Sequence, residues 1–228
     1  MQSNMHTAVF VVVILLSASL ELVGRQAAVA PLDDVRMRAD QGNADAQAEL
    51  GFRYANGRGV SRDQVQAMHW YGLAAEQGHV YTQHNLGVMY SNGRGVPQSQ
   101  TEAAHWFRLA AEQGYDRAQY NLGIMYDTGR GVQLDHVEAV RWLKLAAEQG
   151  HAGGMSYLGA MYGSGKGLSQ DYVRAHMWRS LAASRDTTEN RQIAIEARDA
   201  LARRMTATQL AESRYLTREW EAVHPPGP

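Results

Sequence analysis

The sequence contains no cysteine, which excludes disulfide bonds, thiolate zinc sites and iron–sulfur clusters. An excess of one charge is also missing, because 22 basic and 23 acidic residues leave a formal net charge of −1. A non-specific nucleic-acid binder normally has a basic excess, so we expect no nucleic-acid partner. Lysine is scarce as well. The basic residues other than Lys144 and Lys166 are arginines, whose planar guanidinium groups favour directional hydrogen bonds.

Long hydrophobic runs are rare, and the most apolar one lies near the N-terminus, at residues 8–16. It is shorter than the roughly 20 apolar residues that span a bilayer, but it matches the apolar part of a secretory signal. Ala28 and Ala30 supply the small residues of a cleavage site, although no Lys or Arg precedes the run. We therefore expect residues 1–30 to be a signal peptide, with an uncleaved anchor as the alternative. The protein is then periplasmic or secreted, and the mature chain has no membrane span.

What the sequence does contain is a unit that occurs four times with a period of 36 residues, the spacing between Trp70 and Trp106. The recurring glycines are Gly51, Gly87, Gly123 and Gly159, and the recurring tryptophans are Trp70, Trp106, Trp142 and Trp178. A period of roughly 20–50 residues indicates a solenoid, because each unit must stack on its neighbours to bury its apolar face. Solenoids usually present binding surfaces, so the repeat favours a partner-binding role.

Each unit is predicted to be a helical hairpin. In residues 80–115 apolar and small residues recur with the spacing of an amphipathic first helix. Gly93 ends this helix in a left-handed conformation, and Ser99 is a good N-cap for the second helix. A glycine inside each first helix costs about 1 kcal/mol relative to alanine. We therefore expect the second helix of the same unit to pack closely on that glycine, with its tryptophan covering the gap.

The recurring residues together form a motif. In the first unit they are Ala46, Leu50, Gly51, Tyr54, Gly57, Gly59, Val60, Asp63, Ala67, Trp70, Ala74, Ala75, Glu76 and Gly78. This motif resembles the Sel1-like repeat, a relative of the tetratricopeptide repeat. The resemblance implies an all-α fold, namely a right-handed α-α superhelix (solenoid) of helix-turn-helix repeats. It also implies a scaffold or adaptor role and no chemistry.

The flanking segments are expected to cap the solenoid, because its end repeats would otherwise expose core surface. We predict two C-terminal capping helices. The first buries Ile193, Ala197 and Leu201, and the second begins with a capping box at residues 206–209 and covers the core with Trp220. The predicted divisions are a signal peptide (1–30), an N-terminal capping half-repeat (31–43), four repeats (44–79, 80–115, 116–151 and 152–186), the C-terminal capping helices (187–221) and a disordered tail (222–228).

Motifs for catalysis or for a cofactor are missing, so we predict no catalytic residue, cofactor or metal. There is no serine nucleophile motif, no histidine pair at helical spacing, and the loop at residues 163–167 fails the phosphate-binding pattern. An enzyme acting on cell-wall or β-lactam substrates, as some relatives are named, is the alternative that these absences oppose. One basic residue in each interhelix loop either offsets a helix dipole or belongs to a docking strip for an acidic partner. These residues are Arg58, Arg94, Arg130 and Lys166.

In two-helix solenoids the first helices line the concave side, and residues there that differ between units are not fixed by core packing. In this chain they are rich in Tyr, Arg and Asn, which suit a protein interface, although an ordinary solvated helix face is the alternative. The predicted partner-binding residues are Tyr81, His84, Asn85, Arg117, Tyr120, Asn121 and Tyr157. We therefore expect a non-catalytic scaffold of the cell envelope that binds a protein or peptide segment.

Overall fold

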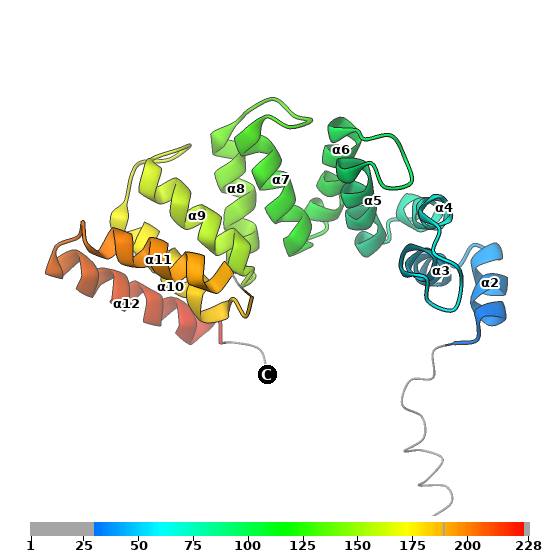
Figure 1. The fold of residues 1–228 in the computed structure, drawn as a ribbon. Helices are drawn as coiled ribbons and strands as arrows, with labels where there is room; N and C mark the ends of the chain where they lie inside the picture. Colours follow the sequence, from blue (N-terminus) through cyan, green and yellow to red (C-terminus); the bar gives the residue numbers. More distant parts are fainter. Residues whose placement is uncertain (1–29, 189, 226–228) are drawn as a thin grey trace, which may run out of the picture.

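The computed structural model of the chain describes residues 30–188 and 190–225. These residues form only helices and no strand (Figure 1). The helices are α2 (Leu32–Asp40), α3 (Ala44–Asn56), α4 (Gln64–Glu76), α5 (Val80–Asn92), α6 (Gln100–Glu112), α7 (Asp116–Thr128), α8 (His136–Glu148), α9 (Ala152–Ser164), α10 (Tyr172–Arg185), α11 (Asn190–Ala202) and α12 (Ala207–Val223). None of these described helices is long and apolar enough to cross a membrane. The predicted signal peptide lies outside the described residues, apart from Ala30.

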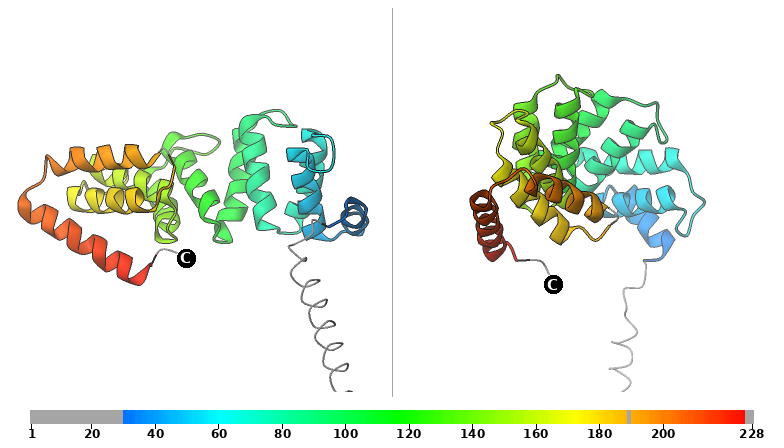
Figure 2. Two further views of the ribbon diagram at one scale, coloured as in Figure 1. Left: turned by 60° about the horizontal axis from the view of Figure 1, so that its bottom comes forward. Right: turned by 60° about the vertical axis from the view of Figure 1, so that its left-hand side comes forward.

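Helices that follow one another in the chain pack together, and four hairpins stack in a row. The first helix of each hairpin packs on its own second helix and on the second helix of the preceding hairpin. In Figure 1 the row follows an arch from α2 at one end to α11 and α12 at the other, and Figure 2 shows it from two further sides. This is the all-α solenoid that the repeat predicts and the right-handed superhelix that the resemblance implies.

The ends of the helices follow from the residues that occupy them. Ser99, the predicted N-cap, and its equivalents in the other repeats each accept a hydrogen bond from a backbone N–H of the first turn of a second helix; these equivalents are Asp63, Asp135 and Asp171. The glycine after each first helix is left-handed, for example with φ 67° at Gly93. His79 and His151, for which the sequence predicts no role, cap α5 and α9, because their Nδ1 atoms accept from backbone N–H groups.

The glycine inside each first helix allows the second helix of the same unit to pack closely, as predicted. A Cβ at Gly87 would lie 2.6 Å from the ring of Phe107, and a Cβ at Gly51 would lie 2.5 Å from the ring of Tyr71. The prediction that the tryptophan covers this gap is wrong. Neighbouring helical residues point about 100° apart, so the residue after each tryptophan fills the gap while the indole faces elsewhere.

The tryptophan instead packs between the first helix of its own repeat and the helix that precedes that repeat. Trp106 packs among side chains of α4 and α5, including Tyr71 and Leu86. Trp70 packs in the same way on α2 and α3. Trp142 is 5 % exposed, so its indole is buried between repeats. The tryptophans therefore join neighbouring repeats, whereas the glycines join the two helices of one repeat.

Both ends of the row are covered. Val35 and Ala39 of α2 pack on the first repeat, and Leu216 and Trp220 of α12 pack on the last core cluster. The capping box predicted at residues 206–209 is present at the start of α12. Both end repeats are therefore capped by helices within the described residues.

Two details of the C-terminal cap differ from the prediction. Ile193 is 59 % exposed and Ala194 is the buried residue of α11, whereas Ala197 and Leu201 of the predicted face are half-buried, so the prediction is wrong for Ile193. The last helix continues to Val223, and the ring of His224 stacks on Trp220 at 4.2 Å between centroids. The disordered tail predicted from residue 222 is therefore wrong for its first residues, and residues 226–228 lie outside the described part.

Candidate functional site

Hollows lie along the first helices α3, α5, α7 and α9, and we call three of them together the first-helix groove. Six of the seven predicted partner-binding residues line it. Tyr81 and Asn85 line the hollow between α3 and α5, Asn121 lines the hollow between α5 and α7, and Arg117, Tyr120 and Tyr157 line the hollow beside α9. Six of these variable residues thus lie in hollows along the first helices.

His84 is the predicted residue that does not line the groove. Its ring lies against the rings of Phe107 and Tyr115, with centroids 5.6 and 5.1 Å away, and its Nε2 is 3.2 Å from Nδ2 of Asn121. Burial lowers the pKa of His84 to about 4, so the imidazole is neutral at neutral pH. His84 therefore joins the first helices of two repeats.

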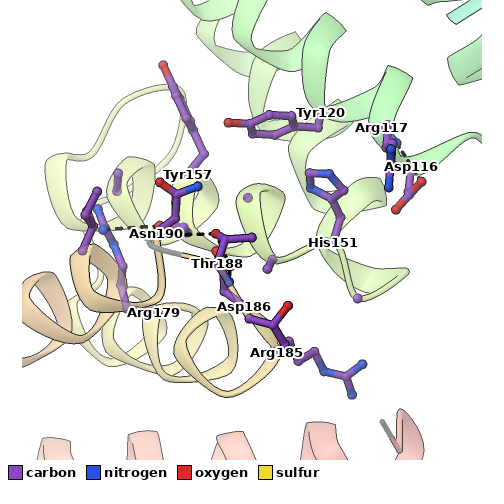
Figure 3. Close-up of a pocket in the computed structure, with 17 residues that line it drawn as sticks. Asp116, Arg117, Tyr120, His151, Tyr157, Arg179, Arg185, Asp186, Thr188 and Asn190 are labelled. Atoms are coloured by element: carbon purple, nitrogen blue, oxygen red, sulfur yellow. Dashed lines mark hydrogen bonds between the residues drawn. The ribbon is translucent and has the colours of Figure 1, made fainter. Parts of the chain in front are cut away.

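The third hollow lies between α7, α9 and the segment that leads from α10 into α11 (Figure 3). We call this hollow, with a volume of ≈ 660 Å³, the repeat-4 cavity. Tyr120 and His151 face each other in it, with ring centroids 4.7 Å apart. Gly153 leaves room for Tyr120, since a Cβ there would lie 3.2 Å from its ring. Burial lowers the pKa of His151, so this wall of the cavity is aromatic and uncharged at neutral pH.

Arg179 of α10 lines the cavity at a position where the other repeats have an apolar residue. The equivalent residues, one period apart, are Tyr71, Phe107 and Leu143, and each packs on the glycine of its own repeat. In repeat 4 the methylene groups of Arg179 make this contact, with Cγ 3.0 Å from where a Cβ on Gly159 would lie. The sequence analysis missed Arg179, although this break in the apolar pattern was a visible signal.

The guanidinium of Arg179 has few polar contacts. Nη1 lies 3.5 Å from Oγ of Ser156, and Nε is buried without a hydrogen-bond partner among the described residues. None of the ion pairs within the described part involves Arg179. Burial lowers the pKa of Arg179, but an arginine stays charged in a protein. The cavity therefore contains a partly desolvated cation.

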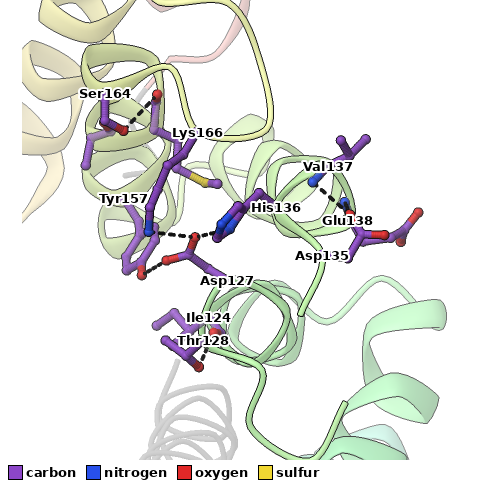
Figure 4. Close-up of polar contacts among 12 residues, drawn as sticks. Ile124, Asp127, Thr128, Asp135, His136, Val137, Glu138, Tyr157, Ser164 and Lys166 are labelled. Carbon is purple, nitrogen blue, oxygen red and sulfur yellow. Dashed lines mark hydrogen bonds and ion pairs between the residues drawn. The ribbon is translucent and has the colours of Figure 1, made fainter. Parts of the chain in front are cut away.

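Asp127 forms the second polar cluster beside the groove (Figure 4). Its carboxylate is 7 % exposed and accepts a 2.6 Å hydrogen bond from the hydroxyl of Tyr157. Nζ of Lys166 lies 3.5 Å away, and Nδ1 of His136 lies 2.8 Å away without the alignment of a hydrogen bond. Burial alone would raise the pKa of Asp127, but Tyr157, Lys166 and His136 together hold it below its usual value.

This cluster links repeats 3 and 4, because Asp127 belongs to α7 whereas Tyr157 and Lys166 belong to α9 and the loop after it. Burial and the bond to Asp127 raise the pKa of Tyr157 to about 12. Its hydroxyl is thus engaged inside the protein, and its ring is the part that lines the repeat-4 cavity. Tyr157 therefore offers a partner aromatic surface and no free donor.

The basic loop residues do not share one type of contact. Lys166 is paired with Asp127, Nε of Arg130 donates to Oγ1 of Thr128, and Arg58 lies 6.0 Å from the ring centroid of Phe52. No hydrogen bond from these side chains to a helix-end carbonyl is found in the part that the structure describes. Residues 30–188 and 190–225 also contain no group of three or more side chains that could hold a metal ion.

Comparisons with known proteins agree with this architecture. The model of the Sel1 repeat family matches residues 44–79, 80–115, 116–151 and 152–186. No curated protein matches the chain significantly. Among solved structures, the chain is similar to a protective antigen present in uropathogenic Escherichia coli strains that displays an SLR fold, with 44% identity and a TM-score of 0.66.

That similarity covers 68% of this chain and 33% of the antigen, so the chain spans about a third of the antigen's length. The chain is also similar to a Sel1 repeat protein from Oxalobacter formigenes, with 33% identity and a TM-score of 0.67. In that case 71% of this chain and 67% of the other chain are covered. Both structures match the chain as a solenoid of the same repeat.

Proposed function

Because the chain belongs to the Sel1 repeat family, whose members are generally scaffolds for protein–protein interaction, we propose that it binds a segment of a partner protein in the first-helix groove and catalyses no reaction. One observation supports the groove in particular. Most positions that face the core keep an apolar or small residue in every repeat, whereas the exposed position of Tyr81 holds Asp45, Arg117 and Gly153 in the other repeats. Packing does not account for this variation, so we attribute it to a partner.

The exposed side chains of the groove suit that role. Tyr81 is 40 % exposed and Arg117 is exposed, and aromatic residues and arginine are enriched in protein interfaces. Tyr81 and Arg117 belong to α5 and α7 and line different hollows. An extended segment that contacts both would therefore lie across the first helices of at least two repeats.

Site-directed photo-crosslinking tests this proposal. A photoreactive residue placed at Tyr81 or Arg117 in the native host should give one specific adduct, which mass spectrometry identifies. The matched control is the same residue at Glu102, which is exposed on α6, a second helix. The adduct should be absent there and should disappear from a Tyr81→Ala, Arg117→Ala double variant that keeps its thermal stability. The same adduct from Glu102 as from Tyr81 would argue against the groove.

We also propose that the scaffold works in the cell envelope. The support is the apolar run at residues 8–16 with Ala28 and Ala30 behind it. Fractionation of the host should place the protein in the periplasm or medium, and N-terminal sequencing should show a start close to Pro31. A full-length protein in the cytoplasmic fraction would contradict export. A full-length protein in the membrane fraction would indicate the uncleaved anchor.

The alternative of an enzyme acting on cell-wall or β-lactam substrates gains no support from the groove. Its lining contains aromatic residues, asparagines and arginines, and no Ser or Cys in it is paired with a general base. We expect the purified protein to leave a chromogenic β-lactam unchanged.

A further inference from the structure

We infer that the repeat-4 cavity holds a carboxylate of the bound peptide and that Arg179 is the residue that recognises it. The inference rests on the proposed function, because it specifies the chemistry of the segment that lies in the groove. The carboxylate belongs to an Asp or Glu side chain or to the C-terminus of the partner. Nothing in the Sel1 repeat motif requires an arginine at this position, so the site is a property of this chain.

The position of Arg179 is the first argument. Tyr71, Phe107 and Leu143 show that the fold needs an apolar side chain here, and an arginine makes the same contact at a cost, because its charge loses water. A buried Nε without a partner adds to that cost. A carboxylate bound to the Nη atoms would offset the lost hydration of the charge, since guanidinium groups form strong charge-assisted hydrogen bonds with carboxylates.

The other basic groups of the cavity leave Arg179 as the available cation at its end of the site. Arg185 donates a hydrogen bond to the backbone carbonyl of His224 and lies over the ring of Trp220, 4.7 Å from its centroid. Arg117 lies at the opposite end of the cavity from Arg179 in Figure 3. An acidic segment that extends from Arg179 along the cavity therefore meets a second positive charge on α7.

The carboxylates that line the cavity are already engaged elsewhere. Asp186 accepts two hydrogen bonds from Thr188, at 2.8 Å from the backbone N–H and 2.6 Å from the hydroxyl. Asp116 accepts a 2.8 Å hydrogen bond from the backbone N–H of Arg117. Neither of these two aspartates forms an ion pair with Arg179. No carboxylate of the described lining therefore occupies the position next to Arg179 that a carboxylate of the peptide would take.

The remaining walls favour an apolar side chain next to the carboxylate. Ile193 is 59 % exposed and lines the cavity together with the rings of Tyr120 and Tyr157. The volume of ≈ 660 Å³ lies within the range of about 300–1,000 Å³ that is typical of ligand sites. An extended peptide can thus place an acidic group on Arg179 and an apolar side chain on Ile193.

Peptide selection followed by fluorescence anisotropy tests the inference. The purified protein selects from a displayed library of random short peptides with free C-termini, and the enriched peptides are made with a fluorescent label. The decisive variant is Arg179→Leu, which restores the residue type that repeat 3 has at this position and should fold at least as well. Arg174→Leu, an exposed arginine of the same helix, is the matched control.

We expect the selected peptides to be rich in Asp or Glu, or to depend on their C-terminus. Arg179→Leu should weaken their binding about 10- to 100-fold, and Arg174→Leu should leave it unchanged. A Glu→Gln change in the peptide and amidation of its C-terminus then show which carboxylate is bound, and loss with either one supports the inference. Glu189 follows Thr188 in the sequence. Because the carboxylate bound by Arg179 comes from the peptide, Glu189→Gln should not weaken binding.

Two results would overturn the inference: peptides without acidic enrichment, or equal binding by wild type and Arg179→Leu. The proposed function is tested by a separate result, the crosslinks in the groove. If crosslinks form at Tyr81 but peptide binding does not depend on Arg179, the scaffold role stands and the carboxylate site does not. If no crosslink forms in the groove, the proposed function fails first.

Discussion

A pair of glycine substitutions tests how the two helices of a repeat pack. Gly87 lies inside α5, where a new Cβ would be 2.6 Å from Cδ1 and Cε1 of Phe107. Gly72 lies inside α4, where a new Cβ would meet nothing within 4 Å. Carbon atoms in contact prefer about 3.5–4.0 Å, so Gly87→Ala requires the ring of Phe107 to move by about 1 Å.

The two substitutions share every effect except this steric one. Each gains about 1 kcal/mol of helix propensity, and each restricts the unfolded chain equally. Overpacking a core costs about 1–3 kcal/mol, and in this pair it applies to Gly87→Ala alone. We therefore expect Gly72→Ala to be more stable than wild type by about 1 kcal/mol and more stable than Gly87→Ala by about 1–3 kcal/mol.

Thermal and urea unfolding followed by far-UV circular dichroism measure this difference. For a chain of this size each kcal/mol moves the melting temperature by about 2–4 °C, so the two variants should be clearly separated. In a Phe107→Ala background, Gly87→Ala should become stabilising, because the ring that opposes the new Cβ is gone. Equal melting temperatures for Gly72→Ala and Gly87→Ala would refute the close-packing argument.

Three further predictions concern single residues. Trp142→Ala should lower the free energy of unfolding by about 3–5 kcal/mol, measured by urea denaturation, because the indole is buried between repeats. Asp127 has a lowered pKa in the fold, so the stability that its charge contributes is present above its ordinary value of 3.8 and is lost as the pH falls through the folded value. Asp127→Asn should therefore be less stable than wild type at neutral pH, and melting curves should converge in acid. His84 has its pKa lowered to about 4, so between pH 6.5 and that value the unfolded chain binds a proton that the folded chain does not. Wild type should lose stability on acidification through this window, and His84→Gln should lose less, as unfolding titrations would show.

Much of the fold was predictable because the repeat supplies the same information four times. Glycine at the position of Gly87 and tryptophan at the position of Trp106 occur in every unit, which indicates a role in packing. The helix caps at Ser99 and Gly93 follow from local backbone chemistry. The period does not show which neighbour a buried side chain faces, so the prediction that the tryptophan covers the glycine was wrong. That question depends on the tertiary geometry of adjacent helices.

The candidate site was predictable in outline only. The variable first-helix positions gave six residues that line the groove, since variation marks freedom from the core. Contacts between side chains about one repeat apart, such as that of Tyr157 with Asp127, have no signal in a single sequence, because nothing pairs the two positions. Arg179 was visible as an interruption of the pattern, but its burial was not, because burial depends on how the helices pack around it.

The placement of each indole on the preceding hairpin has a consequence for dividing the array. Trp106 packs on α4 as well as on α5, so a fragment that begins at residue 80, where the motif begins, would lack the α4 part of the cover of its first indole. A fragment that begins at α4 would keep that cover, just as the native chain supplies α2 ahead of Trp70. The unit that packs together therefore begins one helix before the sequence motif. When repeats are deleted or transplanted, the boundaries should lie in the loop between the two helices of a motif and not between motifs.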